Sequence, residues 1–398
     1  MANNEPVSLI EGRIKKELYE HFRQLGFIRS SNGDLLPPGN SKEVFRQLHR
    51  LQREDRLVDN KDFISRNWDK LNQYFANGTD IVPAQIKPRL ELVQSGSWQA
   101  NLFRLASLSW SIPVSSGYGR RMRFLVWDDS NHKLIGLIAL GDPVFNLKAR
   151  DDLIGWTSED RRQRLVNVMD AYVLGAIPPY NQLLGGKLTA SLIRTREVVD
   201  QFALKYSHRA GLISNQDKAA SLAMVTTTSA LGRSSVYNRL KLGGLSYFNS
   251  IGYTQGWGHF HIPDELFKLI REYLAQEEDP YTSNYNFGQG PNWRMRAIRK
   301  CLTKLGIDQD LLKHGINREI FICLVADNAI DYLAGRDDTA CFEQLLSVNA
   351  VSELAKQRWI IPRATRFPEY RWWRKEQLLM QLIIEDANPP GIVIEGDR

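Results

Sequence analysis

The chain has 398 residues, of which 43% are hydrophobic and 24% are charged. These fractions are typical of globular proteins and exclude a disordered, collagenous or coiled-coil chain, and the length suits two or three domains. Lys and Arg (52) outnumber Asp and Glu (45), so the net charge is +7, which suits a polyanionic partner without requiring one. Three cysteines without C-x-x-C spacing argue against a disulfide framework or a thiolate zinc site.

Residues 1–90 are predicted to form a basic helical region. Apolar residues recur at three- and four-residue steps in LIEGRIKKELYEHFRQLGF and again in SKEVFRQLHRLQ, as on one face of a helix. Because Glu and Asp are interspersed, the basic residues there fit either a phosphate-binding surface or an ordinary solvated face. These residues are Lys15, Lys16, Arg23, Arg46, Arg50 and Arg53.

Residues 91–263 alternate predicted strands with predicted helices. The run Leu134–Leu140 is almost entirely apolar, as in a strand buried on both faces. The whole order predicts an α+β fold with a mixed central sheet, flanked by N-terminal and C-terminal helical regions. The predicted strands are Phe124–Trp127, Leu134–Leu140, Ala171–Ile177, Leu222–Thr228 and Phe248–Phe260, and the predicted helices are Lys187–Tyr206 and Ser234–Leu240.

A glycine turn, Asn181–Lys187, opens the helix after the third of these strands. Paired glycines let a backbone approach a pyrophosphate, and the first amides of a helix attract an anion. Lys187 adds a positive charge. A plain turn at a helix start is the alternative, because short glycine motifs are weak signals.

This order of strand, turn, helix, strand and a short helix with Asn and Tyr resembles the GNAT acetyltransferase core. The resemblance implies that a splayed central strand and the turn hold acetyl-coenzyme A, although the cofactor itself stays unknown. Lys187 stands where the family has Gly or Ala, and Pro178-Pro179 removes two amides. The implied cofactor-binding residues are Gln182, Gly185, Gly186 and Lys187, and the implied catalytic acid is Tyr237.

A general base for such chemistry must be a carboxylate or a histidine within reach of the substrate. Asp142 ends the buried strand and is the first candidate, with Glu197 second. Carboxylates at strand ends also form turns and helix caps, which is the structural alternative. His259 and His261 have no third ligand nearby in sequence, so no metal site is predicted.

Residues 264–398 are predicted to be a helical region, with a strand at Glu319–Val325. Its Lys356–Lys375 stretch, here called the basic-aromatic segment, holds seven basic and five aromatic residues with one acid, Glu369. Cations neutralise phosphates and aromatic rings stack on unpaired bases, whereas tryptophans that seal a domain junction are the alternative. The candidate nucleic-acid-binding residues are Arg358, Trp359, Arg363, Arg366, Arg371, Trp372, Trp373 and Arg374.

The longest apolar run stops at Asp142, too short for a membrane span. The N-terminus, MANNEPVSLIEGRIKKEL, has acids where a signal peptide needs a basic and then apolar run. We therefore expect a cytoplasmic protein with no membrane partner.

Three stretches carry a second resemblance: GAIPPYNQLLGGKLTASL, LGRSSVYNRLKLGGLSYFNSIGYTQGWGHFHIPDE and HGINREIFICLVADNAIDYL. Between about Leu134 and Trp373 the chain resembles the DruA family of Druantia anti-phage defence proteins. The resemblance implies a multi-protein bacterial system with a helicase-like subunit among the partners. We expect a subunit that binds nucleic acid, with DNA as the expected form. The alternative is a GNAT-like acyltransferase or nucleic-acid-modifying enzyme on the same core.

Overall fold

The computed structural model describes residues 7–383 except 30, 32–34, 37, 40, 116, 118, 208–219, 255, 257, 259–261, 277–292 and 314. His259 and His261 therefore lie outside the described residues. Among the described helices, none combines the length and apolar character that crossing a bilayer requires.

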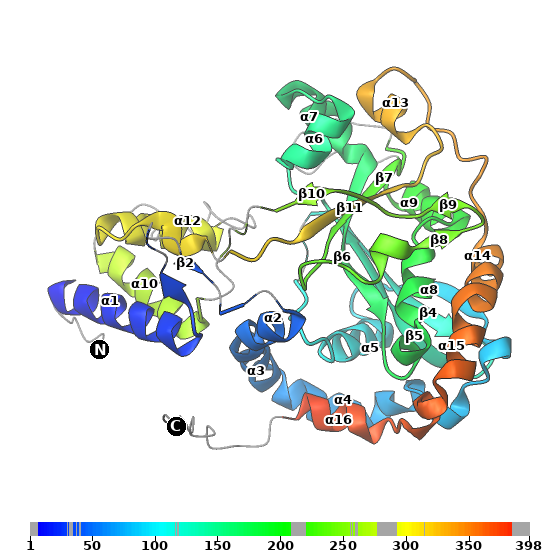
Figure 1. Cartoon of the computed structure of the whole chain (residues 1–398), viewed down its shortest axis with the longest axis horizontal. Helices are drawn as coiled ribbons and strands as arrows, with labels where there is room; N and C mark the ends of the chain where they lie inside the picture. Colours follow the sequence, from blue (N-terminus) through cyan, green and yellow to red (C-terminus); the bar gives the residue numbers. More distant parts are fainter. Residues whose placement is uncertain are drawn as a thin grey trace.

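A seven-stranded mixed sheet forms the centre of the protein (Figure 1). The strands run in the order β10-β11-β7-β6-β5-β4-β3, and all neighbours are antiparallel except β6 and β7. This confirms the predicted α+β class with a mixed central sheet. The strands are β3 (Pro88–Leu92), β4 (Arg121–Asp128), β5 (Lys133–Gly141), β6 (Val168–Ala176), β7 (Met224–Thr228), β10 (Asn249–Tyr253) and β11 (Glu319–Leu324).

The two parallel strands, β6 and β7, separate partway along their length. They pair only at Val168 with Met224, Met169 with Val225 and Asp170 with Thr226, while β6 continues to Ala176. A divergence at this point is what the GNAT resemblance implies, but the likeness to that family remains a prediction.

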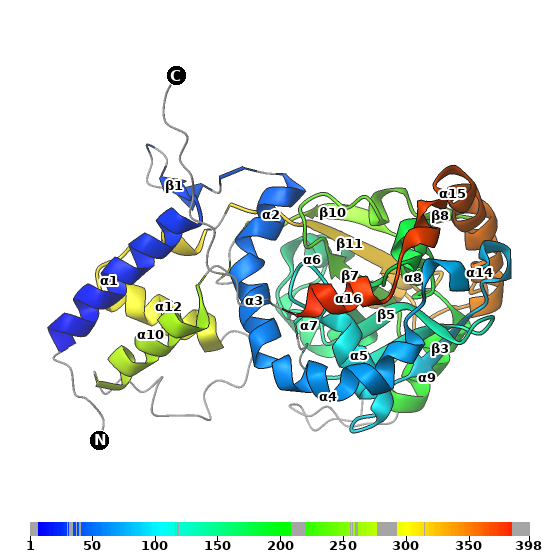
Figure 2. The ribbon, with the colours of Figure 1, turned by 90° about the horizontal axis from the view of Figure 1, so that it is seen from below.

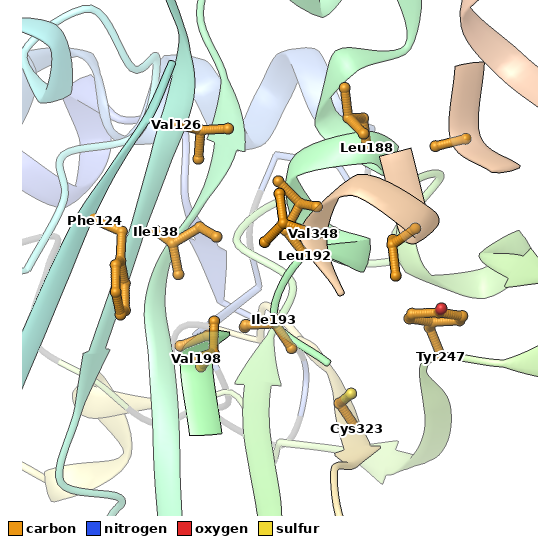
Figure 3. Packing of buried hydrophobic residues seen from close by; sticks show 14 of the residues in the cluster. Phe124, Val126, Ile138, Leu188, Leu192, Ile193, Val198, Tyr247, Cys323 and Val348 are labelled. Carbon is orange, nitrogen blue, oxygen red and sulfur yellow. The ribbon is translucent and has the colours of Figure 1, made fainter. Parts of the chain in front are cut away.

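Helices cover both faces of the sheet because its strands are apolar on both sides. On one face, α8 (Gly185–Ser191), α9 (Arg196–Tyr206) and α14 (Val348–Ala355) pack on β4, β5 and β11, as Figure 3 shows for Leu188, Val198 and Val348. The other face carries two smaller clusters. Their helices are α4 (Lys61–Leu71), α5 (Trp98–Ser107) and α16 (Glu376–Leu382) in one, and α6 (Lys148–Ile154) and α13 (Ala329–Ala334) in the other.

A separate core lies in the helical lobe beside the sheet (Figure 1). It joins α1 (Val7–Gln24) to α10 (Asp264–Gln276) and α12 (Trp293–Lys304), so helices from distant parts of the chain share one apolar cluster. The domain boundaries at 90/91 and 263/264 stay a prediction, and β3 and β11 extend the sheet beyond both of them.

The remaining helices and strands connect these layers. Helices α2 (Lys42–Leu48) and α3 (Arg50–Asp59) lead from the lobe to α4. The other regular elements are β1 (Ile28–Arg29), β2 (Leu35–Leu36), β8 (Lys241–Leu242), β9 (Leu245–Ser246), α7 (Ser158–Arg164) and α15 (Ile361–Arg366).

Candidate functional site

The basic-aromatic segment forms a run of short helical turns at the surface. A π-helical turn, η9 (Lys356–Ile360), leads into α15, and a 3₁₀ turn, η10 (Pro368–Trp372), leads toward α16 (Figure 2). The indole of Trp372 is 76% exposed. The exposed cations of the segment are Arg358, Arg366, Arg371 and Arg374.

Other predicted members of the segment have structural contacts. Trp359 is only 6% exposed and belongs to the main core, so in this fold it is not available to stack on a base. Trp373 is partly buried against the core cluster that contains α4, α5 and α16. Arg363 stacks 3.4 Å from the ring centroid of Phe367 and donates through Nε to the carbonyl of Gln182 at 3.0 Å. Exposure thus separates Trp372 from the other two tryptophans.

Residues some 300 positions earlier in the chain hold the segment in place. The amide of Gly78 donates to the carbonyl of Trp373 at 2.9 Å. Lys375 donates from its backbone to Asn77 at 3.1 Å and from its amine to Asn72 at 2.9 Å. A Cβ on Gly78 would overlap the Tyr370 carbonyl oxygen, so only glycine permits this approach of two backbones.

The glycine turn adopts a tight geometry at the start of α8. Leu184 has a φ of +60°, and the α-carbon of Gly185 faces the carbonyl of Tyr180, where a Cβ would lie 2.5 Å from the oxygen. There is space for a side chain at Gly186, because the atom nearest to an added Cβ would be 3.9 Å away, on Val236. The amides of Gly185 and Gly186 have no hydrogen-bond acceptor among the described residues.

The fold brings the glycine turn and the basic-aromatic segment together. The Lys187 amine lies 5.5 Å from the ring centroid of Trp359, and Gln182 accepts the bond from Arg363. Burial, followed by the nearby charges of Arg239 and Arg358, lowers the pKa of Lys187. The two candidate sites, which are far apart in the sequence, are therefore in contact in the fold.

Tyr237, the implied acid, lies on the 3₁₀ turn η6 (Tyr237–Arg239) with its side chain partly buried. Its ring lies 4.8 Å from that of Phe248 and 5.2 Å from that of Phe321, measured between centroids. Burial raises the pKa of Tyr237 to about 12, against the opposing effect of a hydrogen bond with Thr227. These contacts favour a packing role over proton donation.

Both candidate bases are occupied by structural hydrogen bonds. Asp142 accepts from Nε of Arg120 at 2.7 Å and from its backbone amide at 3.0 Å. Arg120 in turn donates to the carbonyls of Val166 and Val168, so the pair holds the start of β6. The carboxylate of Glu197 accepts from the amide of Val348 at 2.9 Å, at the start of α14. Catalysis by either carboxylate stays a prediction.

A third carboxylate, that of Asp170, was not among the residues predicted from the sequence. Asp170 is the last residue of β6 that pairs with β7. Oγ1 of Thr226, its partner on β7, donates to Oδ1 of Asp170 at 2.7 Å. Burial raises the pKa of Asp170 to about 6, although Thr226 and the Arg150 charge oppose the shift. The only signal for it in the sequence is a lone acid inside the apolar strand VMDAYVLGA.

Comparisons with known proteins identify the family. The family model of Druantia protein DruA matches residues 39–335. The chain belongs to the DruA family. Druantia protein DruA from Escherichia coli (strain UMEA 4076-1) is 54% identical over 372 residues, which cover 94% of this chain and 92% of that protein. No solved structure matches the chain. The resemblance seen in the sequence is thus confirmed.

Replacing Asp170 with Asn is expected to stabilise the DruA-family fold at neutral pH. The pKa of Asp170 is about 6 in the folded protein and 3.8 for an ordinary aspartate, so ionisation of this side chain opposes folding above pH 6 and not below pH 4. The free energy of unfolding should therefore rise by about 1 to 3 kcal/mol at pH 7.5 and change little at pH 4. Chemical denaturation at both values measures it.

Asp142→Asn is the matched control, because that carboxylate pairs with Arg120 and its loss should lower stability at pH 7.5. Equal destabilisation by both substitutions at pH 7.5 would contradict the assignment of Asp170 as an acid that opposes folding.

Proposed function

We propose that this chain is a nucleic-acid-binding component of Druantia anti-phage defence that acts with other Druantia proteins, including a helicase-like subunit. Membership of the DruA family supports the defence role. The observation that carries nucleic-acid binding is the exposure of Trp372, with the exposed cations Arg371 and Arg374 close to it in the sequence. An exposed aromatic ring with cations close by suits a base and its flanking phosphates.

The charges of this surface are not neutralised by nearby acids. Within the described parts of the chain, none of Arg358, Arg366, Arg371 and Arg374 forms an ion pair. Among the described residues, the guanidinium of Arg374 donates only to the carbonyls of Arg371 and Trp373, which leaves its charge uncompensated. Unpaired arginines on one surface attract a polyanion.

A salt series with the purified chain tests the proposal. Single-stranded and duplex DNA should both bind at low ionic strength, and affinity should fall steeply toward physiological salt as counterions are released. RNA of the same sequence serves as the comparison. Absence of binding to every one of these ligands at the lowest salt would refute the proposed function.

Trp372→Ala is expected to weaken single-strand binding by about 1 to 3 kcal/mol, or 5- to 150-fold, because one base stack is lost. Duplex binding should change little, since paired bases do not offer a free face. Fluorescence anisotropy with labelled oligonucleotides gives both values. Tyr253→Ala, which removes another exposed aromatic ring on β10, should leave both affinities unchanged. Equal losses of single-strand affinity in the Trp372→Ala and Tyr253→Ala variants would contradict stacking of a base on Trp372.

The enzyme alternative has one observation in its favour, the divergence of β6 and β7 beyond Asp170 next to the glycine turn. Packing of Tyr237 against Phe248 and the use of Asp142 by Arg120 weigh against it. We therefore place acyl transfer second.

A further inference from the structure

Three segments that each carry a cation come together at the beginning of α8. Lys187 belongs to α8, Arg239 to η6 and Arg358 to the π-helical turn η9. The Lys187 amine stands 5.5 Å from the ring of Trp359, the residue after Arg358. The side chain of Val236 would lie 3.9 Å from a Cβ on Gly186, which sets the start of η6 against the same turn.

The cluster has no compensating acid in the described structure. The side chains of Lys187, Arg239 and Arg358 form neither an ion pair nor a hydrogen bond with any described residue, although acids pair with many other arginines of the chain. Both arginines are exposed and Lys187 is half-buried, so solvent and ligands reach all three. The charges of Arg239 and Arg358 add to burial in lowering the pKa of Lys187, as expected when like charges are crowded.

An anion relieves this repulsion, and a phosphate group suits it best. Arginine forks bind two phosphate oxygens at once, and a lysine amine supplies a point charge. The ring of Trp359 fixes the position of Lys187, so less side-chain freedom is lost when a ligand binds. Arg363, bound to the carbonyl of Gln182, joins this cluster to the rest of the basic-aromatic segment.

We propose that Lys187, Arg239 and Arg358 form a phosphate-binding site that takes a backbone phosphate of a single-stranded nucleic acid. The inference that the phosphate belongs to a nucleic acid rests on the proposed function, whereas the phosphate-binding site itself does not. A pyrophosphate-bearing cofactor such as coenzyme A carries the same chemistry. The site extends the nucleic-acid path from Trp372 across η9 to the glycine turn.

The test uses the full chain with Lys187, Arg239 and Arg358 all replaced by Ala. A control variant, Lys148→Ala with Arg162→Ala and Arg336→Ala, removes three charges from α6, α7 and the end of α13 (Figure 1). The probes are inorganic pyrophosphate and coenzyme A, read as shifts in melting temperature, and a labelled single-stranded DNA oligonucleotide, read by anisotropy.

Pyrophosphate is expected to raise the melting temperature of the wild type and the control, but not of the triple variant. DNA affinity should fall at least 10-fold in the triple variant relative to the control, and the slope of log K against log salt should become shallower by about 0.7, because one phosphate contact is lost. The unliganded triple variant should melt no lower than the wild type, because repulsion is removed. Lys187→Met, which keeps the aliphatic contact with Trp359, repeats the test should the triple variant fold poorly.

Three results would overturn all or part of the proposal. Equal binding of pyrophosphate and DNA by the triple variant and the control would refute the site. If the triple variant lost the melting-temperature shift with coenzyme A but bound DNA as tightly as the control, the phosphate would not come from a nucleic acid, and the site would be assigned to a cofactor. A wild type that binds pyrophosphate through these residues but binds no nucleic acid would refute the proposed function while the site stands.

Discussion

Gly78→Ala is expected to lower the free energy of unfolding by about 3 kcal/mol or more and to displace the basic-aromatic segment. The added methyl group would overlap the carbonyl of Tyr370 and lie 2.6 Å from the Cα of Arg371. Both neighbours are backbone atoms, so no side-chain rotation relieves the clash. The bond from the Gly78 amide to Trp373 would be lost with the movement.

Chemical denaturation measures the stability change, and anisotropy with a single-stranded oligonucleotide measures its effect on binding. Gly12→Ala is the matched control, because nothing lies within 4 Å of its Cβ position in helix α1. That substitution should stabilise the helix by up to about 1 kcal/mol. If Gly78→Ala were as stable as the wild type and bound DNA equally well, this anchoring contact would not position the segment.

Gly185→Ala and Gly186→Ala, adjacent in the sequence, are expected to have opposite effects. A Cβ on Gly185 would lie 2.5 Å from the carbonyl oxygen of Tyr180, which should cost about 2 to 3 kcal/mol of stability. At Gly186 the new methyl group meets only Val236 at 3.9 Å, so alanine should be neutral or stabilise α8 by less than about 1 kcal/mol. Urea denaturation of the two variants, one residue apart, compares them directly, and equal stability would contradict the turn geometry.

This difference decides how the acyltransferase alternative can be tested. A substitution of Gly185 disturbs the turn itself, so Gly186→Asp is the informative variant, because its carboxylate would repel a pyrophosphate without the clash. We expect acetyl-coenzyme A to raise the melting temperature of the wild type no more than inorganic pyrophosphate does at the same concentration, because only its phosphate groups would meet the cations around Lys187. A clearly larger rise that Gly186→Asp abolishes would favour the enzyme, and Tyr237→Phe would then show whether turnover needs that hydroxyl.

The main strands and helices could be predicted from the sequence because their patterns are local. The apolar run of β5 and the helical spacing of α1, α10 and α12 each lie within one element. The predicted helix Lys187–Tyr206 is two helices in the structure, α8 and α9. Between these two helices, Thr195 forms a β-bridge with Leu346. The hydrophobic periodicity of the sequence cannot predict such a long-range contact.

Part of the candidate site could also be predicted, because amino-acid composition is a local property of the sequence. The composition of the basic-aromatic segment indicated exposed cations, and Arg371 and Arg374 are exposed. Composition does not distinguish Trp372, at the surface, from Trp359, in the core, because that difference depends on residues packed from elsewhere in the chain. The meeting of Lys187 with Arg239 and Arg358, and the anchoring by Gly78, likewise depend on tertiary contacts.

Ultraviolet cross-linking of a single-stranded oligonucleotide to the full chain, followed by identification of the modified peptides, tests the location of binding most directly. We expect the cross-links to concentrate on the peptide that contains Trp372, with further cross-links on peptides around Lys187 and Arg239. They should weaken as salt is raised, because phosphate contacts supply much of the affinity. Cross-links confined to the helical lobe of α1, α10 and α12, with none in residues 356–375, would contradict the proposed interface.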